Sequence, residues 1–153
     1  MTQELTQLRD MHLGRVLLKL ERQFTQQVLS QLAEQGITEI TLRHFVVIPF
    51  VTDVGIRSVE IAKKAGVSKQ AVGKLVEELE GYGYLKVRPD PNDGRASLVF
   101  LSDKGEHFLQ TAIESTKVLE SQWQQLIGAE RFNNMKQAVI DVLNGSYTHM
   151  TLP

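Results

Sequence analysis

Residues 58–81 read SVEIAKKAGVSKQAVGKLVEELEG, and this stretch decides the fold of the chain. Its apolar residues recur at the three- and four-residue spacing of two short amphipathic helices. Gly66 lies between them and can take the left-handed conformation that ends a helix. Ser68 follows where a hydroxyl can cap the next helix. Together with the small Ala62 and with Val72, this spacing predicts a helix-turn-helix.

The polar side of the second helix favours DNA binding over the alternative, an ordinary helical hairpin in a core. Its first two turns offer residues that are short, polar or positively charged. These are Ser68, Lys69, Gln70, Gly73 and Lys74. A recognition helix places its N-terminal residues in the major groove, where Lys and Gln can read base edges. We therefore predict that these residues contact DNA.

Two segments with strand propensity follow, residues 84–87 and 98–101, and the dense turn signal PDPNDG lies between them. Two strands and a turn directly after a helix-turn-helix predict a wing. Arg95 at its tip is expected to enter the minor groove or contact phosphate. Asp93 is expected to orient a nearby arginine. Arg88 is expected either to contact phosphate or to pair with Asp93. The alternative for these residues is a solvent-exposed turn of little energetic weight.

The remaining segments have helical patterns. Residues 5–35 carry a long apolar stripe, and a helix of about 30 residues is better explained if part of it meets another chain. Residues 38–51 are expected to form a second helix, capped by Thr38 or Thr41 and kinked near its end by Pro49. Ile56 and Arg57 are expected to form a short strand.

Two further helices are expected at residues 103–127 and 130–143, separated by Gly128 and stopped by Asn144 and Gly145. The predicted fold class is mainly α with a small β-wing. It combines a winged helix-turn-helix lobe with a helical dimerisation bundle from the N- and C-terminal helices. The expected divisions are residues 1–36 for dimerisation, 37–105 for DNA binding and 106–153 for dimerisation. We expect residues 146–153 to be loose.

Composition sets limits on function. The 153 residues are 42% hydrophobic with a net charge of −1, enough to bury a core but without a general basic field. Residues 57–104 carry a net charge of +2 and the remainder −3, so the positive excess lies around the predicted DNA-binding lobe. With no cysteine, disulfides and Cys-based zinc sites are excluded. We expect a cytoplasmic protein with no membrane association, because no long apolar run or signal-peptide layout is present.

No catalytic residues, cofactor or metal site are expected. Serine, histidine and acidic residues lack the spacing of a catalytic triad, and no Gly-rich phosphate loop is present. The histidines are His12, His44, His107 and His149, and no two lie four residues apart on one helix. We expect them to be exposed or interfacial.

The wing and its flanks closely resemble those of the MarR family of bacterial transcription regulators. The resemblance is carried by the segments VEIA at 59–62, LVEELE at 75–80, GYL at 83–85 and DPNDGRASLVFLSDKG at 90–105. Asp93 and Arg95 fall on the Asp and Arg of the family's wing signature. Two positions depart from the family pattern. Gly94 replaces the first of two adjacent arginines, and Gly73 stands where many members have Ser or Thr.

The resemblance implies a homodimer that binds a palindromic DNA operator and usually represses it until a small-molecule effector binds. It places the effector between the helical bundle and the winged lobes, where the apolar run from Phe45 to Val51 lies. Arg15 and His44 are the candidate polar groups there. The alternative function is a winged-helix protein-interaction module that has lost operator binding.

Overall fold

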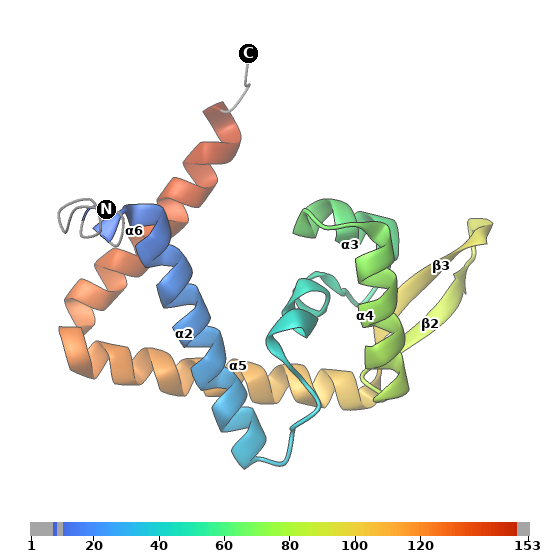
Figure 1. The fold of residues 1–153 in the computed structure, drawn as a ribbon, viewed down its shortest axis with the longest axis horizontal. Helices are drawn as coiled ribbons and strands as arrows, with labels where there is room; N and C mark the ends of the chain where they lie inside the picture. Colours follow the sequence, from blue (N-terminus) through green and yellow to red (C-terminus); the bar gives the residue numbers. More distant parts are fainter. Residues whose placement is uncertain (1–7, 9–10, 150–153) are drawn as a thin grey trace. The chain divides into compact units, whose positions relative to one another are not determined.

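The structure, a computed structural model, describes residue 8 and residues 11–149, without the side chains of residues 146–149 (Figure 1). The chain forms two compact units, Met1–Ser115 and Thr116–Pro153. The first unit contains the helix-turn-helix and its wing. No helix in the described part of the chain is long and apolar enough to cross a membrane.

The predicted helix-turn-helix is confirmed. It consists of α3 (Ser58–Ala65) and α4 (Lys69–Gly81). Gly66 ends α3 in the left-handed conformation, with φ 67° and ψ 29°. The Ser68 hydroxyl oxygen accepts a hydrogen bond of 3.1 Å from the backbone N–H of Ala71 and so caps α4.

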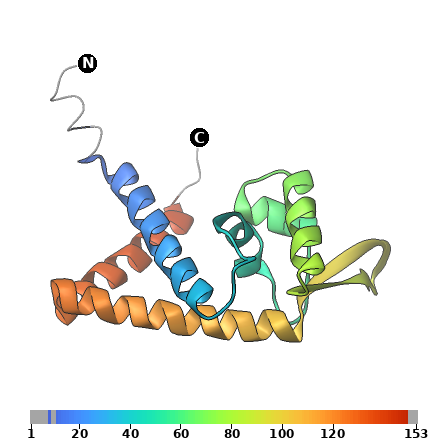
Figure 2. The same ribbon diagram turned by 60° about the horizontal axis from the view of Figure 1, so that its bottom comes forward.

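The predicted strands are also confirmed. A three-stranded antiparallel sheet has the order β1-β3-β2, with β1 at Ile56–Arg57, β2 at Leu85–Asp90 and β3 at Asp93–Leu101. Figure 2 shows the β2–β3 hairpin leaving the N-terminal end of α5. We call β1, α3, α4, β2 and β3 together the winged lobe.

The turn at the wing tip is shorter than the sequence predicts. Asp90 pairs with Asp93 across the hairpin, so only Pro91 and Asn92 lie outside the strands. The turn closes because an Asp90 carboxylate oxygen accepts a 2.8 Å hydrogen bond from the backbone N–H of Asn92. Pro89 remains within β2, where register irregularity begins between it and Asp90.

The first helix is interrupted, which corrects the prediction of one helix over residues 5–35. The long helix of the structure is α2 (Leu13–Glu34), and His12 before it has extended backbone angles of φ −58° and ψ 130°. Gly14 in the first turn has low helix propensity, so nothing local favours continuing the helix through His12. Residues 5–7 and 9–10 of the predicted helix lie outside the described residues.

The helix predicted over residues 38–51 is wrong. Two 3-10 turns stand there, η1 (Leu42–Val46) and η2 (Ile48–Phe50). Pro49 lacks an N–H group and disfavours helical geometry in the residue before it. The β-branched residues that precede Pro49 add to this effect, because they lower helix propensity. Thr41 is at the N-cap position of η1, one of the two caps predicted.

The last two helices are α5 (Asp103–Ile127) and α6 (Ala129–His149). Gly128 separates them with a φ of 89°, as predicted. The prediction that Asn144 and Gly145 end the last helix is wrong, since α6 continues through them to His149. Gly145 has no positive φ, so it occupies the helix at a cost of about 1 kcal/mol relative to alanine. The expected loose tail is therefore helical at residues 146–149, and residues 150–153 lie outside the described part.

The core of the winged lobe joins α3, α4 and the sheet to the start of α5. Its fully buried residues include Ile61, Val72, Leu79, Val99 and Phe108. The rings of Phe108 and Tyr84 meet edge to face at 5.4 Å. This contact anchors the first turns of α5 against β2 and so fixes where the wing begins.

A glycine permits the close approach of α5 to the backbone just before β2. A Cβ at Gly105 would lie 2.1 Å from the carbonyl oxygen of Tyr84, far inside contact distance. The Ser102 hydroxyl donates to the carbonyl of Gly83, and it accepts a 3.0 Å hydrogen bond from the N–H of Gly105. The turn between β3 and α5 therefore depends on the serine and the glycine together.

Candidate nucleic-acid interface

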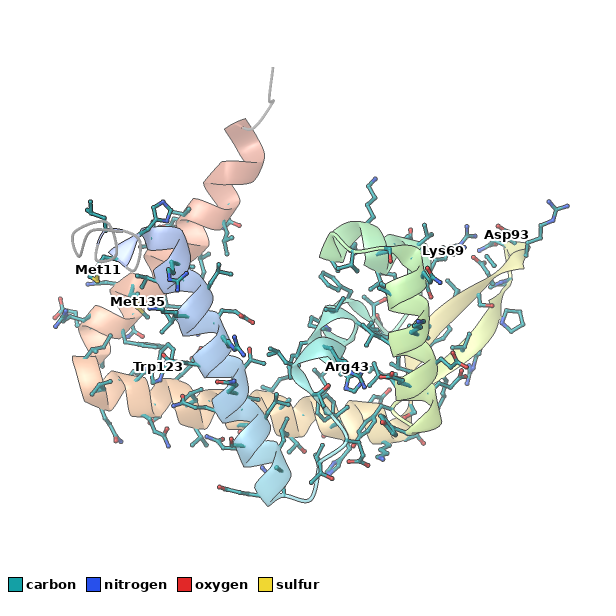
Figure 3. All side chains as sticks on the ribbon, viewed as in Figure 1. Met11, Arg43, Lys69, Asp93, Trp123 and Met135 are labelled. Atoms are coloured by element: carbon teal, nitrogen blue, oxygen red, sulfur yellow. The ribbon has the colours of Figure 1, made fainter. Side chains whose placement is uncertain are left out.

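The recognition helix α4 buries one side and exposes the other. Val72, Val76 and Leu79 are buried in the lobe. All five residues that the sequence singles out on this helix and its cap are exposed, namely Ser68, Lys69, Gln70, Gly73 and Lys74. Figure 3 shows Lys69 at the beginning of α4. The structure therefore brings the predicted base-reading residues together on the leading turns of one exposed helix.

The acidic residues of α4 lie on its later turns, and Glu78 and Glu80 contact neighbouring elements. A carboxylate oxygen of Glu78 lies 3.0 Å from a guanidinium nitrogen of Arg43. A Glu80 oxygen accepts a hydrogen bond of 3.2 Å from the backbone N–H of Val87 in β2. Because these carboxylates are occupied near the far end of the helix, the first two turns keep their positive potential.

The wing tip presents Arg95, which is exposed (Figure 3, where Asp93 is labelled). The carboxylate of Asp93 accepts a hydrogen bond of 3.1 Å from the backbone N–H of Arg95. Asp93 thus orients the backbone that carries Arg95. Arg88, also exposed, has its guanidinium carbon 5.7 Å from the centre of the Phe100 ring on β3.

An ion pair beside the turn of the wing was not predicted from the sequence. The Arg57 Nε donates to Oδ2 of Asp90 at 2.8 Å, and a second guanidinium nitrogen donates to the same oxygen. The third guanidinium nitrogen lies 3.6 Å from Oδ2 of Asp93. We call Arg57, Asp90 and Asp93 the wing clamp. The Asx-turn spacing of Asp90 and Asn92 was a readable signal, but no pattern links Arg57 to a residue 33 positions away.

The contacts of the wing clamp stabilise the charged forms of Asp90 and Arg57. Asp90 is only 6% exposed. The backbone hydrogen bond from Asn92 and then the Arg57 guanidinium lower the pKa of the Asp90 carboxyl below its usual 3.8. The hydrogen bonds to Asp90 raise the pKa of Arg57. Asp90 is therefore ionised at neutral pH despite its burial.

His44 is fully buried, which corrects the expectation of an exposed or interfacial histidine. Its Nδ1 accepts a hydrogen bond of 3.0 Å from the backbone N–H of Thr41. The proton of the neutral ring is therefore on Nε2, which lies 3.1 Å from Oε2 of Glu78. The same Glu78 oxygen meets Arg43, labelled in Figure 3 beside α4. The imidazole can be fully buried because both of its ring nitrogens have hydrogen-bond partners.

The other effector candidate, Arg15, is exposed on the first turn of α2. A cavity of about 310 Å³ lies elsewhere in the first unit, lined by the loop before β1, the end of β3 and the first turns of α5. It is lined by Val51, Thr52, Asp53, Phe100, Leu101, Glu106 and Leu109. The apolar run that ends at Val51 thus reaches a cavity, although Arg15 and His44 are not among its lining residues.

Comparison with known proteins agrees with this geometry. The MarR family model matches residues 38–96, from before η1 to the wing. No curated protein matches the chain. Among solved structures, wild-type MarR from E. coli in its apo form has 22% sequence identity and a TM-score of 0.72. The alignment covers 86% of this chain and 96% of that one.

Two structures of CouR are also similar. CouR from Rhodococcus jostii RHA1 bound to p-coumaroyl-CoA has 19% identity and a TM-score of 0.66, covering 87% of this chain and 92% of that one. The transcriptional repressor CouR bound to a 23-mer DNA duplex has 21% identity and a TM-score of 0.66. That alignment covers 89% of this chain and 95% of CouR. At these identities the structures establish a common fold.

The helix-turn-helix and wing observed here span the matched segment, and the likeness in fold extends well beyond it. Residues 38–96 match the model of the MarR family, and the winged helix-turn-helix fold of the chain is similar to that of wild-type MarR from E. coli.

Proposed function

We propose that this protein is a transcription regulator that binds double-stranded DNA in a sequence-specific manner. The observation that carries the proposal is the exposed face on the first two turns of α4, next to a wing whose tip presents Arg95. Lys69, Gln70 and Lys74 would meet base edges in the major groove, while Ser68 would donate to a phosphate. Arg95 would contact the minor groove or its phosphates, with Asp93 and Arg88 as supporting residues. The CouR complex with DNA supports this use of the fold.

The experiment is selection of bound duplexes from a random library, followed by titration of the selected sequence at several salt concentrations. A regulator should select a palindrome, and its affinity should fall steeply as salt is raised, because bound cations are released from the phosphates. The alternative is a protein-interaction module with a winged-helix fold. It would enrich no sequence and show no salt-dependent preference for the selected duplex over a scrambled one.

We further propose that the protein works as a homodimer in the cytoplasm, as a repressor that a small molecule releases. A palindrome requires two recognition helices about one helical turn of DNA apart, which a two-fold dimer supplies. Exposed apolar residues on α2 and α6 support assembly through the terminal helices. They include Leu13 and Leu18 at 70% exposure each, Val142 at 68% and Leu143 at 56%.

The effector proposal rests on the family's regulators, of which CouR is seen bound to p-coumaroyl-CoA. An effector must bind two arrangements of the protein with different affinity in order to release DNA. We propose Arg15 as the contact for an acidic group. His44 would transmit the effect of the bound molecule to α4, because its bond to Glu78 connects η1 to that helix. Aromatic acids should raise the melting temperature and weaken operator binding. If they do neither, regulation by such ligands is wrong for this protein.

A further inference from the structure

We propose that Arg57 is the residue that positions the wing for DNA binding, by holding its turn in one conformation before DNA arrives. Arg57 belongs to β1, the strand that leads into the helix-turn-helix, and Asp90 and Asp93 flank the turn of the wing. The ion pair therefore connects the tip of the hairpin to β1, the strand that directly precedes α3. The effect on DNA binding rests on the proposed function, whereas the effect on the wing does not.

The geometry explains why the hairpin needs such a residue. Strand β1 has only two residues, and its partners on β3 are Leu98 and Val99. The ladder with β1 thus ends several residues before the wing tip, and a projecting two-stranded ribbon is marginally stable by itself. The side chain of Arg57 extends support to Asp90 and Asp93, beyond the point where backbone pairing with β1 stops.

The clamp also sets the conformation that carries Arg95. One Asp90 oxygen is held by Arg57, and the other accepts the N–H of Asn92 that closes the turn. One Asp93 oxygen faces Arg57, and the other accepts the N–H of Arg95. Each carboxylate thus bridges the guanidinium to a backbone group of the turn. A planar fork with several donors fits this arrangement, and a lysine ammonium does not.

The clamp has a second consequence for an anionic partner. Two carboxylates beside the wing tip would repel phosphates, and Arg57 neutralises part of their charge at short range. The Arg57 guanidinium contacts both carboxylates, whereas Gly94, next to Asp93, adds no charge of its own. Replacing Arg57 should therefore weaken DNA binding through the position and surroundings of Arg95, without Arg57 itself touching DNA.

A spin label can test the clamp without DNA. The chain contains no cysteine, so a single Gly94→Cys substitution gives one labelling site. A Cβ at Gly94 meets no atom within 4 Å, and the residue is exposed. Adding Arg57→Met to this labelled protein should narrow the nitroxide spectrum, because the turn then moves faster. With Arg57→Lys in its place, the spectrum should lie between those of the Arg57 protein and the Arg57→Met variant.

Two controls separate this effect from general loosening. Arg43→Met removes another arginine–carboxylate contact of the first unit, in which Arg43 lies 3.0 Å from Glu78, and it should leave the Gly94 spectrum unchanged. A label at Gly73→Cys, also exposed and unobstructed, should be insensitive to Arg57→Met. If Arg57→Met unfolds the lobe, Asp90→Asn replaces it, since an asparagine can keep the Asn92 hydrogen bond while losing the charge. An unchanged Gly94 spectrum in a folded clamp variant overturns the proposal.

A double-mutant cycle then tests the link to DNA with the selected duplex. Arg57→Met and Arg95→Ala should each raise Kd about tenfold, and the double variant should raise it by little more than either one. Additive losses, about a hundredfold together, would mean that Arg57 acts independently of Arg95 and would overturn positioning. If the parent protein selects no duplex, the proposed function fails, and the spin-label result still decides whether the clamp orders the wing.

Discussion

The Nε2 atom of His44 lies 3.1 Å from the Oε2 atom of Glu78, and this contact joins η1 to the recognition helix. The imidazole is fully buried, and its other nitrogen is bonded to the backbone of Thr41. Glu78 is four residues after Lys74, so the bond holds the helix one turn beyond the residues that we propose face DNA. A change at η1 would therefore reach α4 directly.

Replacing His44 by alanine should destabilise the first unit by about 1–3 kcal/mol. The substitution removes both hydrogen bonds and leaves a cavity, and the Thr41 N–H loses its acceptor. Urea unfolding followed by circular dichroism measures the loss. His107→Ala is the matched control, because His107 is exposed on α5 and its side chain should contribute little. Equal midpoints for the two variants would show that the His44 contacts carry no stability.

Gly105→Ala should destabilise the protein by about 1–3 kcal/mol or more. A methyl group there collides with the Tyr84 carbonyl oxygen at 2.1 Å, and backbone on both sides resists movement. Gly73→Ala serves as the control, since that helical glycine faces open space. The control should gain about 0.4–1 kcal/mol by restricting the unfolded chain. Thermal unfolding of both variants checks the opposite signs, and two shifts of the same sign would contradict the account.

Asp90 should contribute to loss of stability in acid. Its pKa is lowered in the folded protein, so the ionised carboxyl stabilises the fold above the ordinary value of 3.8. That stability is lost as the pH falls from about 4 through the lower folded pKa. Asp90→Asn should therefore be less stable than the parent near neutral pH, and the difference should shrink in acid. Urea midpoints measured from about pH 6 down to about pH 3 test this, and a pH-independent difference would contradict it.

The protein should sediment as a dimer at micromolar concentration. Leu143 is 56% exposed in the single chain, so Leu143→Glu should be tolerated by the monomer while destabilising assembly. Asn133→Glu, at another exposed position of α6, adds the same charge and should leave the dimer intact. Deleting residues 129–153 should also yield monomers. A monomeric parent, or a truncated protein that stays dimeric and fully stable, would refute assembly through the terminal helices.

Local signals predicted the winged lobe well. The left-handed Gly66 and the Ser68 cap are set by neighbouring residues, and the strands by β-propensity and a dense turn. The exposed face of α4 followed from the same periodicity that predicted its buried face. Gly128 likewise separated α5 from α6 as its position suggested. These features depend on contacts within a few positions of sequence.

The failures share a physical cause. The apolar pattern of residues 38–51 fits a helix. Pro49 and the β-branched residues before it nevertheless favour two separate 3-10 turns. The leucine stripe similarly hid the break at His12, since periodicity does not report backbone angles. The wing clamp and the His44–Glu78 contact join residues more than 30 positions apart, and one sequence holds no signal for such pairs.

The most direct test of the central claim compares Gln70→Ala and Arg95→Ala on matched and mismatched operator duplexes at several salt concentrations. Gln70→Ala should lose about 1–3 kcal/mol of discrimination at one base position with nearly the same salt dependence. Arg95→Ala should weaken binding to all sequences and reduce the salt slope by roughly one unit in each half-site. If both variants bind every duplex as the parent does at every salt concentration, the exposed face of α4 and the wing tip are not a DNA-binding surface.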